Sequence, residues 1–295
     1  MTWVFHFLGA LPLWLNHRIG GLLGWLGWLL SGRHRRITRE NLERFAAFSG
    51  VSQRSALTRA VISAQGQGLT EMAVAWTAPL ERLQQLVVDC RGWEHIDAAQ
   101  AGGRAILFVS PHLGCYDLAG RYLSSRTPIT AMYRPPKQAW LEPIMQAGRV
   151  RGAGNTVTAD AAGVRGLLRT LKNGGSVMIL PDQVPAPEQG GDGVWADFFG
   201  SPAYTMTLLP RLAKSANAVV LFCFAERLPR GAGYRMHIQP MTGAYTGDRL
   251  ADARQTNALV EQLICMAPAQ YLWGYNRYKQ PAGAPPPPSP DASAQ

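Results

Sequence analysis

Apolar positions along the chain follow two patterns, one up to about residue 86 and another from about residue 104. In the first part, ITRENLERFAAF, residues 55–76 and PLERLQQLVV carry apolar residues three or four positions apart, which predicts helices. In the second part, short apolar runs predict buried strands, and one alternating run is typical of an edge or antiparallel strand. These runs are AILFVS (105–110), PITAMYR (128–134), SVMIL (176–180), AVVLFCF (218–224) and the alternating YRMHIQP (234–240).

Helical segments separate these predicted strands. GVRGLLRTLKNGG (163–175) is one, and YTMTLLPRLAKSANA (204–218) is another, kinked at Pro210. Strands that alternate with helices predict an α/β fold with a mainly parallel central sheet flanked by helices. The expected organisation is a membrane anchor at 1–31, a helical region at 32–100, an α/β domain at 101–280 and a disordered Pro-rich tail at 281–295.

The N-terminal segment 2–30 has the composition of a membrane-associated helix. It contains no acid and one Arg, Arg18, and its four Trp residues are typical of interfacial anchors. The basic stretch RHRRITRENLER follows it, which by the positive-inside tendency keeps the rest of the chain in the cytoplasm. Arg18 near the centre would cost about 2.5–3.5 kcal/mol in a spanning helix. Pro12 also allows two shorter helices in the interface, and a buried soluble helix is the remaining alternative.

The amino-acid composition indicates which classes of molecule the protein is expected to bind. Charged residues make up 16% of the chain, against roughly 25% in typical soluble proteins. The net charge is +10, which favours anionic partners such as phosphorylated substrates, acidic proteins or anionic lipids. The four Cys residues are far apart and fit neither a disulfide framework nor a zinc site, so a reducing compartment and no metal or cofactor are expected.

Polar residues follow three of the predicted strands. His112, Arg134 and Asp182 come at or just after the ends of the runs 105–110, 128–133 and 176–180. Because ligands gather at the carboxyl ends of parallel strands, we expect these three side chains to share one edge of the sheet.

His112 also has an acid, Asp117, five residues further on, in FVSPHLGCYDLAG. The two side chains can meet if Gly114 makes a tight turn and Asp117 lies in the first turn of the following helix. Asp117 would then accept the Nδ1 proton and leave Nε2 free as a base. The spacing alone is weak, because about 0.4 such matches arise by chance in a chain of this composition.

The context makes the spacing informative, because H-x-x-x-x-D after an apolar strand resembles the signature of glycerolipid and lysophospholipid acyltransferases. Further blocks are similar to the bacterial late acyltransferases of lipid A biosynthesis, the lauroyl/myristoyl transferases, and the resemblance covers nearly everything except the Pro-rich tail. Many members of that family carry Glu where Asp117 stands. The blocks are GWEHIDAA (92–99), YRPPKQAWLEP (133–143), GRVRG (148–152), GLLRTLKNGGSVMILPDQ (166–183), GVWADFFGSPAYTMT (193–207) and QYLWGYNRYK (270–279).

The resemblance implies an enzyme of the bacterial inner membrane with its catalytic domain on the cytoplasmic side. It would move a fatty acyl chain from acyl carrier protein to a hydroxyl of a phosphorylated glycolipid. This glycolipid is the lipid A precursor, which becomes part of lipopolysaccharide. His112 would be the general base and Asp117 its partner. No cofactor, metal or nucleic acid is implied.

The resemblance also implies residues that bind substrate. Arg151 is the first choice for the acceptor's phosphates, because GRVRG aligns its second arginine with the essential arginine of the family; Arg149 and Arg134 follow. Asp182 matches a functional acid, with a role in binding substrate or positioning an arginine. Gly193, Phe198 and Phe199 are expected to shape the acyl pocket.

Three alternatives stay open. Cys115, three residues from His112, could act as a covalent nucleophile. The acceptor could be a lysophospholipid or another lipid with a free hydroxyl. A basic, membrane-attached protein that binds anionic lipid without catalysis would also explain the charge and the N-terminus, but not the ordered blocks. Nucleophile elbows, phosphate-binding P-loops and H-E-x-x-H zinc motifs do not occur in the sequence.

Overall fold

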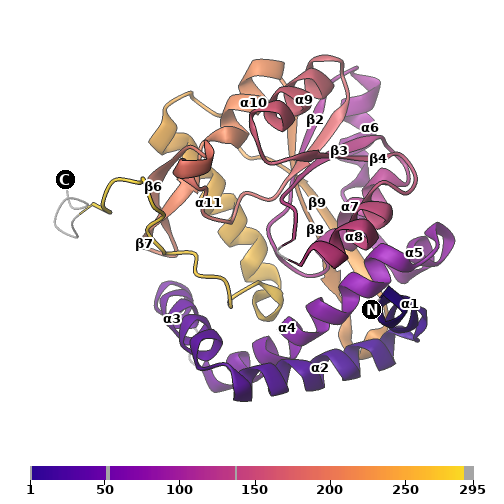
Figure 1. Ribbon diagram of the computed structural model, residues 1–295. Coiled ribbons are helices and arrows are strands. Elements are labelled where there is room, and N and C mark those ends of the chain that lie inside the picture. Colours follow the sequence, from indigo (N-terminus) through magenta and orange to yellow (C-terminus); the bar gives the residue numbers. More distant parts are fainter. Residues whose placement is uncertain (1, 51–53, 137, 289–295) are drawn as a thin grey trace.

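The N-terminal third of the chain is helical. The computed structural model describes residues 2–50, 54–136 and 138–288. A break at Leu11–Pro12 separates the first two helices, which is the arrangement that Pro12 allowed. Figure 1 shows α2 running along α4 below the central sheet. The helices are α1 (Thr2–Ala10), α2 (Leu13–Leu30), α3 (Gly32–Ser49), α4 (Arg54–Thr77) and α5 (Leu80–Leu86).

Glycines bring the backbones of α2 and α4 together. A Cβ on Gly66 would lie 2.0 Å from the carbonyl oxygen of Gly20, so no larger residue fits at this crossing. The opposite side of α1 and α2 is exposed and apolar. Among the described residues, no helix is both long enough and apolar enough to cross a membrane. The exposed large side chains here are Trp3, Phe7, Trp14, Leu22, Leu23, Trp25, Leu26, Leu29 and Leu30.

A seven-stranded sheet forms the centre of the rest of the described chain, in the order β1-β9-β8-β2-β5-β3-β4. The strands β8, β2, β5, β3 and β4 are parallel, whereas β9 is antiparallel to β8 and parallel to β1. The fold is therefore α/β with a mainly parallel sheet, as predicted. The strands are β1 (Val87–Arg91), β2 (Ile106–Val109), β3 (Ile129–Tyr133), β4 (Gly154–Thr158), β5 (Ser176–Ile179), β8 (Val219–Arg227) and β9 (Tyr234–Pro240).

Helices cover both faces of this sheet, and a separate hairpin of two strands lies beside it (Figure 1). Alternate residues of β2 serve the two faces: Ile106 and Phe108 belong to one buried cluster, and Leu107 and Val109 to the other. The remaining elements are α6 (Trp93–Ala101), α7 (Tyr116–Ser124), α8 (Glu142–Arg149), α9 (Ala161–Lys172), α10 (Leu208–Ala216), α11 (Arg249–Met266) and the hairpin strands β6 (Gly193–Phe198) and β7 (Ser201–Met206).

Two local predictions were wrong. The helical pattern ends at Leu86 rather than 88, because Val87–Arg91 pairs with β9 as a strand. The segment 204–218 is not one helix: its start belongs to β7, and α10 begins at Leu208, with Pro210 in the first turn, where a missing N–H leaves no hydrogen bond unmade. The alternating run 234–240 is an antiparallel strand, which is one of the two possibilities predicted for it: β9 pairs antiparallel with β8 inside the sheet, and β1 forms the edge.

The Pro-rich tail is described in part. Residues 281–288 form neither helix nor strand, and the indole N–H of Trp195 donates to the carbonyl of Pro285 (2.9 Å). The other residues of the tail that was predicted to be disordered, 289–295, lie outside the described chain.

Candidate active site

A tight turn after β2 presents His112 at the carboxyl edge of the sheet. Gly114 in this turn has φ +60°, and a Cβ there would lie 2.0 Å from the carbonyl oxygen of Ala225. The amide of Cys115 donates to that same carbonyl (2.9 Å), and α7 begins at Tyr116. The predicted turn at Gly114 and the position of Asp117 in the first helical turn are therefore confirmed.

Asp182, which follows β5, holds the imidazole of His112. Its Oδ1 lies 2.8 Å from Nδ1, and its Oδ2 accepts the backbone N–H of His112 (2.9 Å). The strands β2 and β5 are adjacent and parallel, which brings these two residues together as their positions at the strand ends predicted. Burial alone would raise the pKa of Asp182, but the charge and hydrogen bonds of His112 hold this pKa below its ordinary value.

This pairing fixes the chemistry of the ring. With Nδ1–H donated to the carboxylate, Nε2 carries the lone pair and is the basic atom. The side-chain amide of Gln183 lies 3.1 Å from Nε2 and donates to it in this tautomer. The ring edge also contacts Tyr116, at a centroid distance of 4.8 Å. The basic nitrogen of His112 is therefore covered by an amide, while a carboxylate orients the ring.

Asp117 does not hold His112, which corrects the geometry expected from the five-residue spacing. Its Oδ1 accepts a hydrogen bond from Nε of Arg149 (2.8 Å) and forms an ion pair with Nη2 of the same guanidinium (2.7 Å). The helix α7 packs beside α8, so a side chain in its first turn reaches the end of α8, while Asp182 already occupies Nδ1 of His112. Burial would lower the pKa of Arg149, but the Asp117 carboxylate raises it above the ordinary value.

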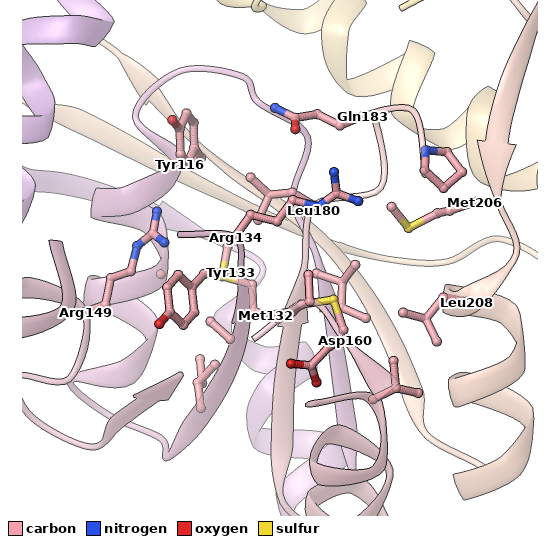
Figure 2. Close-up of a pocket in the computed structure, with 18 of the residues that line it drawn as sticks. Tyr116, Met132, Tyr133, Arg134, Arg149, Asp160, Leu180, Gln183, Met206 and Leu208 are labelled. Carbon is pink, nitrogen blue, oxygen red and sulfur yellow. The ribbon is translucent and has the colours of Figure 1, made fainter. Parts of the chain in front are cut away.

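A cavity of about 590 Å³ adjoins these groups. His112, Asp117, Arg134 and Arg149, all singled out from the sequence, line it. Figure 2 shows Arg149, Tyr116 and Tyr133 at one end, Arg134 in the middle, and Met206 and Leu208 at the other end. The cavity thus carries arginine and tyrosine side chains at one end and apolar side chains at the other, where Asp192 and Arg211 also line it. Its apolar walls include Met132, Val164, Leu180, Val184, Met206 and Leu208.

A second cavity of about 160 Å³ also reaches His112 and Tyr116. Leu69 and Met72 of α4 line it together with Leu272. His112 thus borders two described cavities.

Several residues singled out from the sequence lie elsewhere. Arg151 is outside both described cavities, and its Nη1 donates to the carbonyl of Thr77 (3.0 Å). Phe198 and Phe199 are buried in the core, against Tyr271, Trp273 and Phe45, because the β6–β7 hairpin turns its aromatic side inward.

Gly193, at the start of β6, lies against Tyr204 and Pro185; it too is outside both described cavities. The expectation that Gly193, Phe198 and Phe199 form the wall of the acyl pocket therefore does not match this cavity.

Cys115 is not placed as a nucleophile. Its side chain is buried and lines neither described cavity, and burial raises the pKa of its thiol well above the ordinary value. Within the described part of the chain, no cluster of three or more His, Cys, Asp or Glu side chains could hold a metal ion.

Sequence reasoning missed three residues of this site: Gln183, Tyr116 and Arg121. Gln183 follows Asp182 directly, and Tyr116 precedes Asp117. Arg121 comes four residues after Asp117, so it shares a face of α7 with that residue and lines the same cavity. The i,i+4 spacing on a predicted helix was the available signal for Arg121.

Comparison with known proteins gives a consistent family. A family model described as bacterial lipid A biosynthesis acyltransferase matches residues 2–280. The chain is 29% identical to the lipid A biosynthesis lauroyltransferase of Escherichia coli K12 over 292 residues, covering 97% of this chain and 94% of the relative. It is also 29% identical to the palmitoleoyltransferase of the same strain over 288 residues (94% and 91%). A Haemophilus influenzae lipid A biosynthesis acyltransferase is 28% identical over 271 residues (90% and 82%).

Proposed function

The chain belongs to the bacterial lipid A biosynthesis acyltransferase family and is an acyltransferase, and we propose that it moves a fatty acyl chain from an acyl carrier protein thioester to a hydroxyl of a lipid A precursor. One observation carries the mechanism: Asp182 holds Nδ1 of His112, and His112 lines a cavity that holds both guanidinium groups and a set of apolar side chains.

The proposed reaction is direct transfer with His112 as general base. The acceptor hydroxyl takes the place of the Gln183 amide at Nε2 and gives its proton to that nitrogen as its oxygen attacks the thioester carbon. The tetrahedral intermediate collapses, the C–S bond breaks, and the thiolate takes the proton back from the imidazolium. Asp182 stabilises the imidazolium between these two transfers.

Arginines near His112 suit the phosphates of the acceptor. Arg134 is exposed at the middle of the cavity, and Arg149 keeps part of its guanidinium open, with 22% of its side chain exposed. A forked guanidinium binds phosphate with two parallel hydrogen bonds. In this proposal Arg149 takes the role for which the resemblance favoured Arg151, and the apolar end of the cavity holds the acyl chain.

The apolar face of α1 and α2 supports a membrane-associated enzyme. The indoles of Trp3 and Trp14 are exposed together with the leucines of α2, a combination typical of helices that lie in the interface. We infer that this face rests on the cytoplasmic side of the inner membrane, where the lipid acceptor resides.

The donor carries the opposite charge to the enzyme. Arg165, Arg169 and Lys172 are exposed on α9, next to the residues of this helix that line the cavity. Acyl carrier protein is strongly acidic, so these residues form a suitable docking face. A transfer rate that falls as ionic strength rises supports this face, and a rate that is indifferent to salt argues against it.

The experiment that tests the function incubates the purified protein in membranes with acyl carrier protein thioester and either a lipid A precursor or a lysophospholipid. We expect acyl product with the lipid A precursor, detected by mass spectrometry. Product with the lysophospholipid alone would change the acceptor. Lipid binding without product in either case would overturn the enzymatic mechanism.

A further inference from the structure

One oxygen of the Asp117 carboxylate is left unpaired. Both the hydrogen bond from Nε of Arg149 and the ion-pair contact with its Nη2 are made to Oδ1, while Oδ2 is buried and has no hydrogen-bond partner in the described part of the chain. A buried acceptor without a partner costs about 1–3 kcal/mol. Such an atom in the wall of a substrate cavity therefore needs an explanation.

Arg121, one helical turn further along α7, has buried hydrogen-bond donors without partners among the described residues. It is 2% exposed, and its Nη1 donates to the carbonyls of Ala75 (2.5 Å) and Ala78 (3.0 Å) at the end of α4. Its Nε and Nη2 are buried, and no described residue accepts a hydrogen bond from them. Burial, and then the charge of Arg151, lower the pKa of Arg121 to about 10, against the opposing effect of Asp117.

The Asp117 carboxylate has two guanidinium groups as possible partners, those of Arg149 and Arg121, and of the two only Arg149 pairs with it. Asp117 and Arg121 stand at i and i+4 on α7, the spacing at which oppositely charged side chains on a helix meet. Asp117, Arg121 and Arg149 all line the main cavity. Resting on the function proposed above, we propose that Arg121 is a reserve partner for Asp117, which takes over the carboxylate when Arg149 turns to an anionic group of the bound acceptor.

Burial explains why a reserve partner is needed. Asp117 is 8% exposed, so if Arg149 left it for a phosphate, an ionised carboxylate would remain without any partner in a nearly dry site. Arg121 is anchored to α4 by Nη1 and stays in place, and its two nitrogens without a described partner, Nε and Nη2, belong to the same helix as Oδ2. The exchange replaces one ion pair by another, so Arg149 becomes available to substrate at little cost. Arg121 is thus a positioning residue that acts through Asp117.

A double-mutant cycle on acceptor binding tests this handover. All variants carry His112→Ala, so that no acyl transfer occurs during the measurement. The dissociation constant for a radiolabelled phosphorylated lipid A precursor is then measured in mixed micelles. We expect Arg121→Gln to weaken binding about tenfold when Asp117 is present, and about twofold or less in the Asp117→Asn background, where no carboxylate needs a partner. Arg121→Lys keeps the positive charge but loses the forked geometry of the guanidinium. The weakening of acceptor binding that it causes should likewise require Asp117.

Controls separate this role from a structural one. Arg126→Gln changes an arginine that follows α7 and stacks on Trp93 and Tyr122 outside the cavity, so it should leave binding unchanged. Thermal melting of each variant reports any loss of the contacts from Arg121 to α4. Equal weakening by Arg121→Gln in both backgrounds, or no weakening in either, would overturn the handover. Failure of the proposed function looks different: the acceptor would not bind even when Arg121 and Asp117 are both intact.

Discussion

Two buried carboxylates, Glu71 on α4 and Asp117 on α7, lie in contrasting environments. Both oxygens of Glu71 are paired: Nε and Nη2 of Arg227 each donate to it at 2.6 Å, and the hydroxyl of Tyr234 donates at 2.8 Å. Nε2 of His17 from α2 lies 2.7 Å away. Among the described residues, Asp117 has a single partner, Arg149, on a single oxygen.

We interpret the difference as one between a structural cluster and the proposed binding site. The Glu71 cluster joins α2, α4, β8 and β9 and so ties the N-terminal helices to the sheet, a role that requires one fixed arrangement. The Asp117 group lines the cavity and keeps unused hydrogen-bonding capacity, which allows it to rearrange around a ligand. Saturated and unsaturated polar clusters therefore predict different consequences of mutation.

Among the residues that line the cavity, we expect removal of the proposed base, His112, to have the largest effect on the rate of acyl transfer. His112→Ala should lower the rate of acyl transfer by about 10²–10⁴-fold, because no other group takes the proton of the acceptor hydroxyl. The midpoint of thermal unfolding should change little. His95→Ala, a histidine on α6 outside both described cavities, is the matched control and should keep full activity. A His112→Ala enzyme that turns over normally would contradict the assignment.

On the structural side, Glu71→Gln should act on folding. It leaves Arg227 charged and buried without its counter-ion, which typically costs about 3–5 kcal/mol of unfolding free energy. Urea titration measures this loss, and Glu94→Gln, on the exposed start of α6, should change it by less than about 0.5 kcal/mol. Equal stability of the two variants would show that the Glu71 cluster does not tie the helices to the sheet.

The same cluster has a predicted pH dependence. Burial alone would raise the pKa of Glu71, but Arg227 and His17 lower it from 4.5 to about 2. A lowered pKa stabilises the fold fully above the unfolded value of 4.5, and this stabilisation is lost as the pH falls through about 2. The difference in unfolding free energy between wild type and Glu71→Gln should therefore shrink below pH 4.5. A difference that is constant from pH 6 to pH 2 would argue against the lowered pKa.

The smallest expected effect is at Cys115. Its thiol is buried, lines neither described cavity and has a raised pKa, so Cys115→Ser should leave the transfer rate unchanged. A trapped acyl-enzyme on Cys115, seen by mass spectrometry of the intact protein, would instead establish the covalent route.

Apolar patterning predicted the five strands with the strongest sequence signals because each of those runs is bounded by polar or turn residues. It missed β1, β4 and the hairpin strand β6; the residues of β1 and β4 are exposed or only partly buried and so lack a continuous apolar run. The start of 204–218 was assigned to a helix because Tyr204, Leu208 and Leu212 have helical spacing, while the pairing of β7 with β6 depends on residues far along the chain.

At the site, the sequence identified His112, Asp182, Arg134 and Arg149 but paired His112 with the wrong acid. Spacing along the chain favoured Asp117, five residues away, whereas the actual partner Asp182 is separated by 70 residues and is brought close by the pairing of β2 with β5. Local distance in the sequence carries no information about neighbours in a parallel sheet, whose adjacent strands are joined by long connections.

The most direct test of the central claim compares kcat and KM for Asp182→Asn and Asp117→Asn, each checked for an unchanged fold. If Asp182 orients the base, Asp182→Asn should lower kcat by about 10²–10⁴-fold, since the amide favours the wrong tautomer of His112. Asp117→Asn should act mainly on KM for the acceptor, through Arg149. A collapse of kcat in Asp117→Asn together with normal turnover in Asp182→Asn would contradict the account.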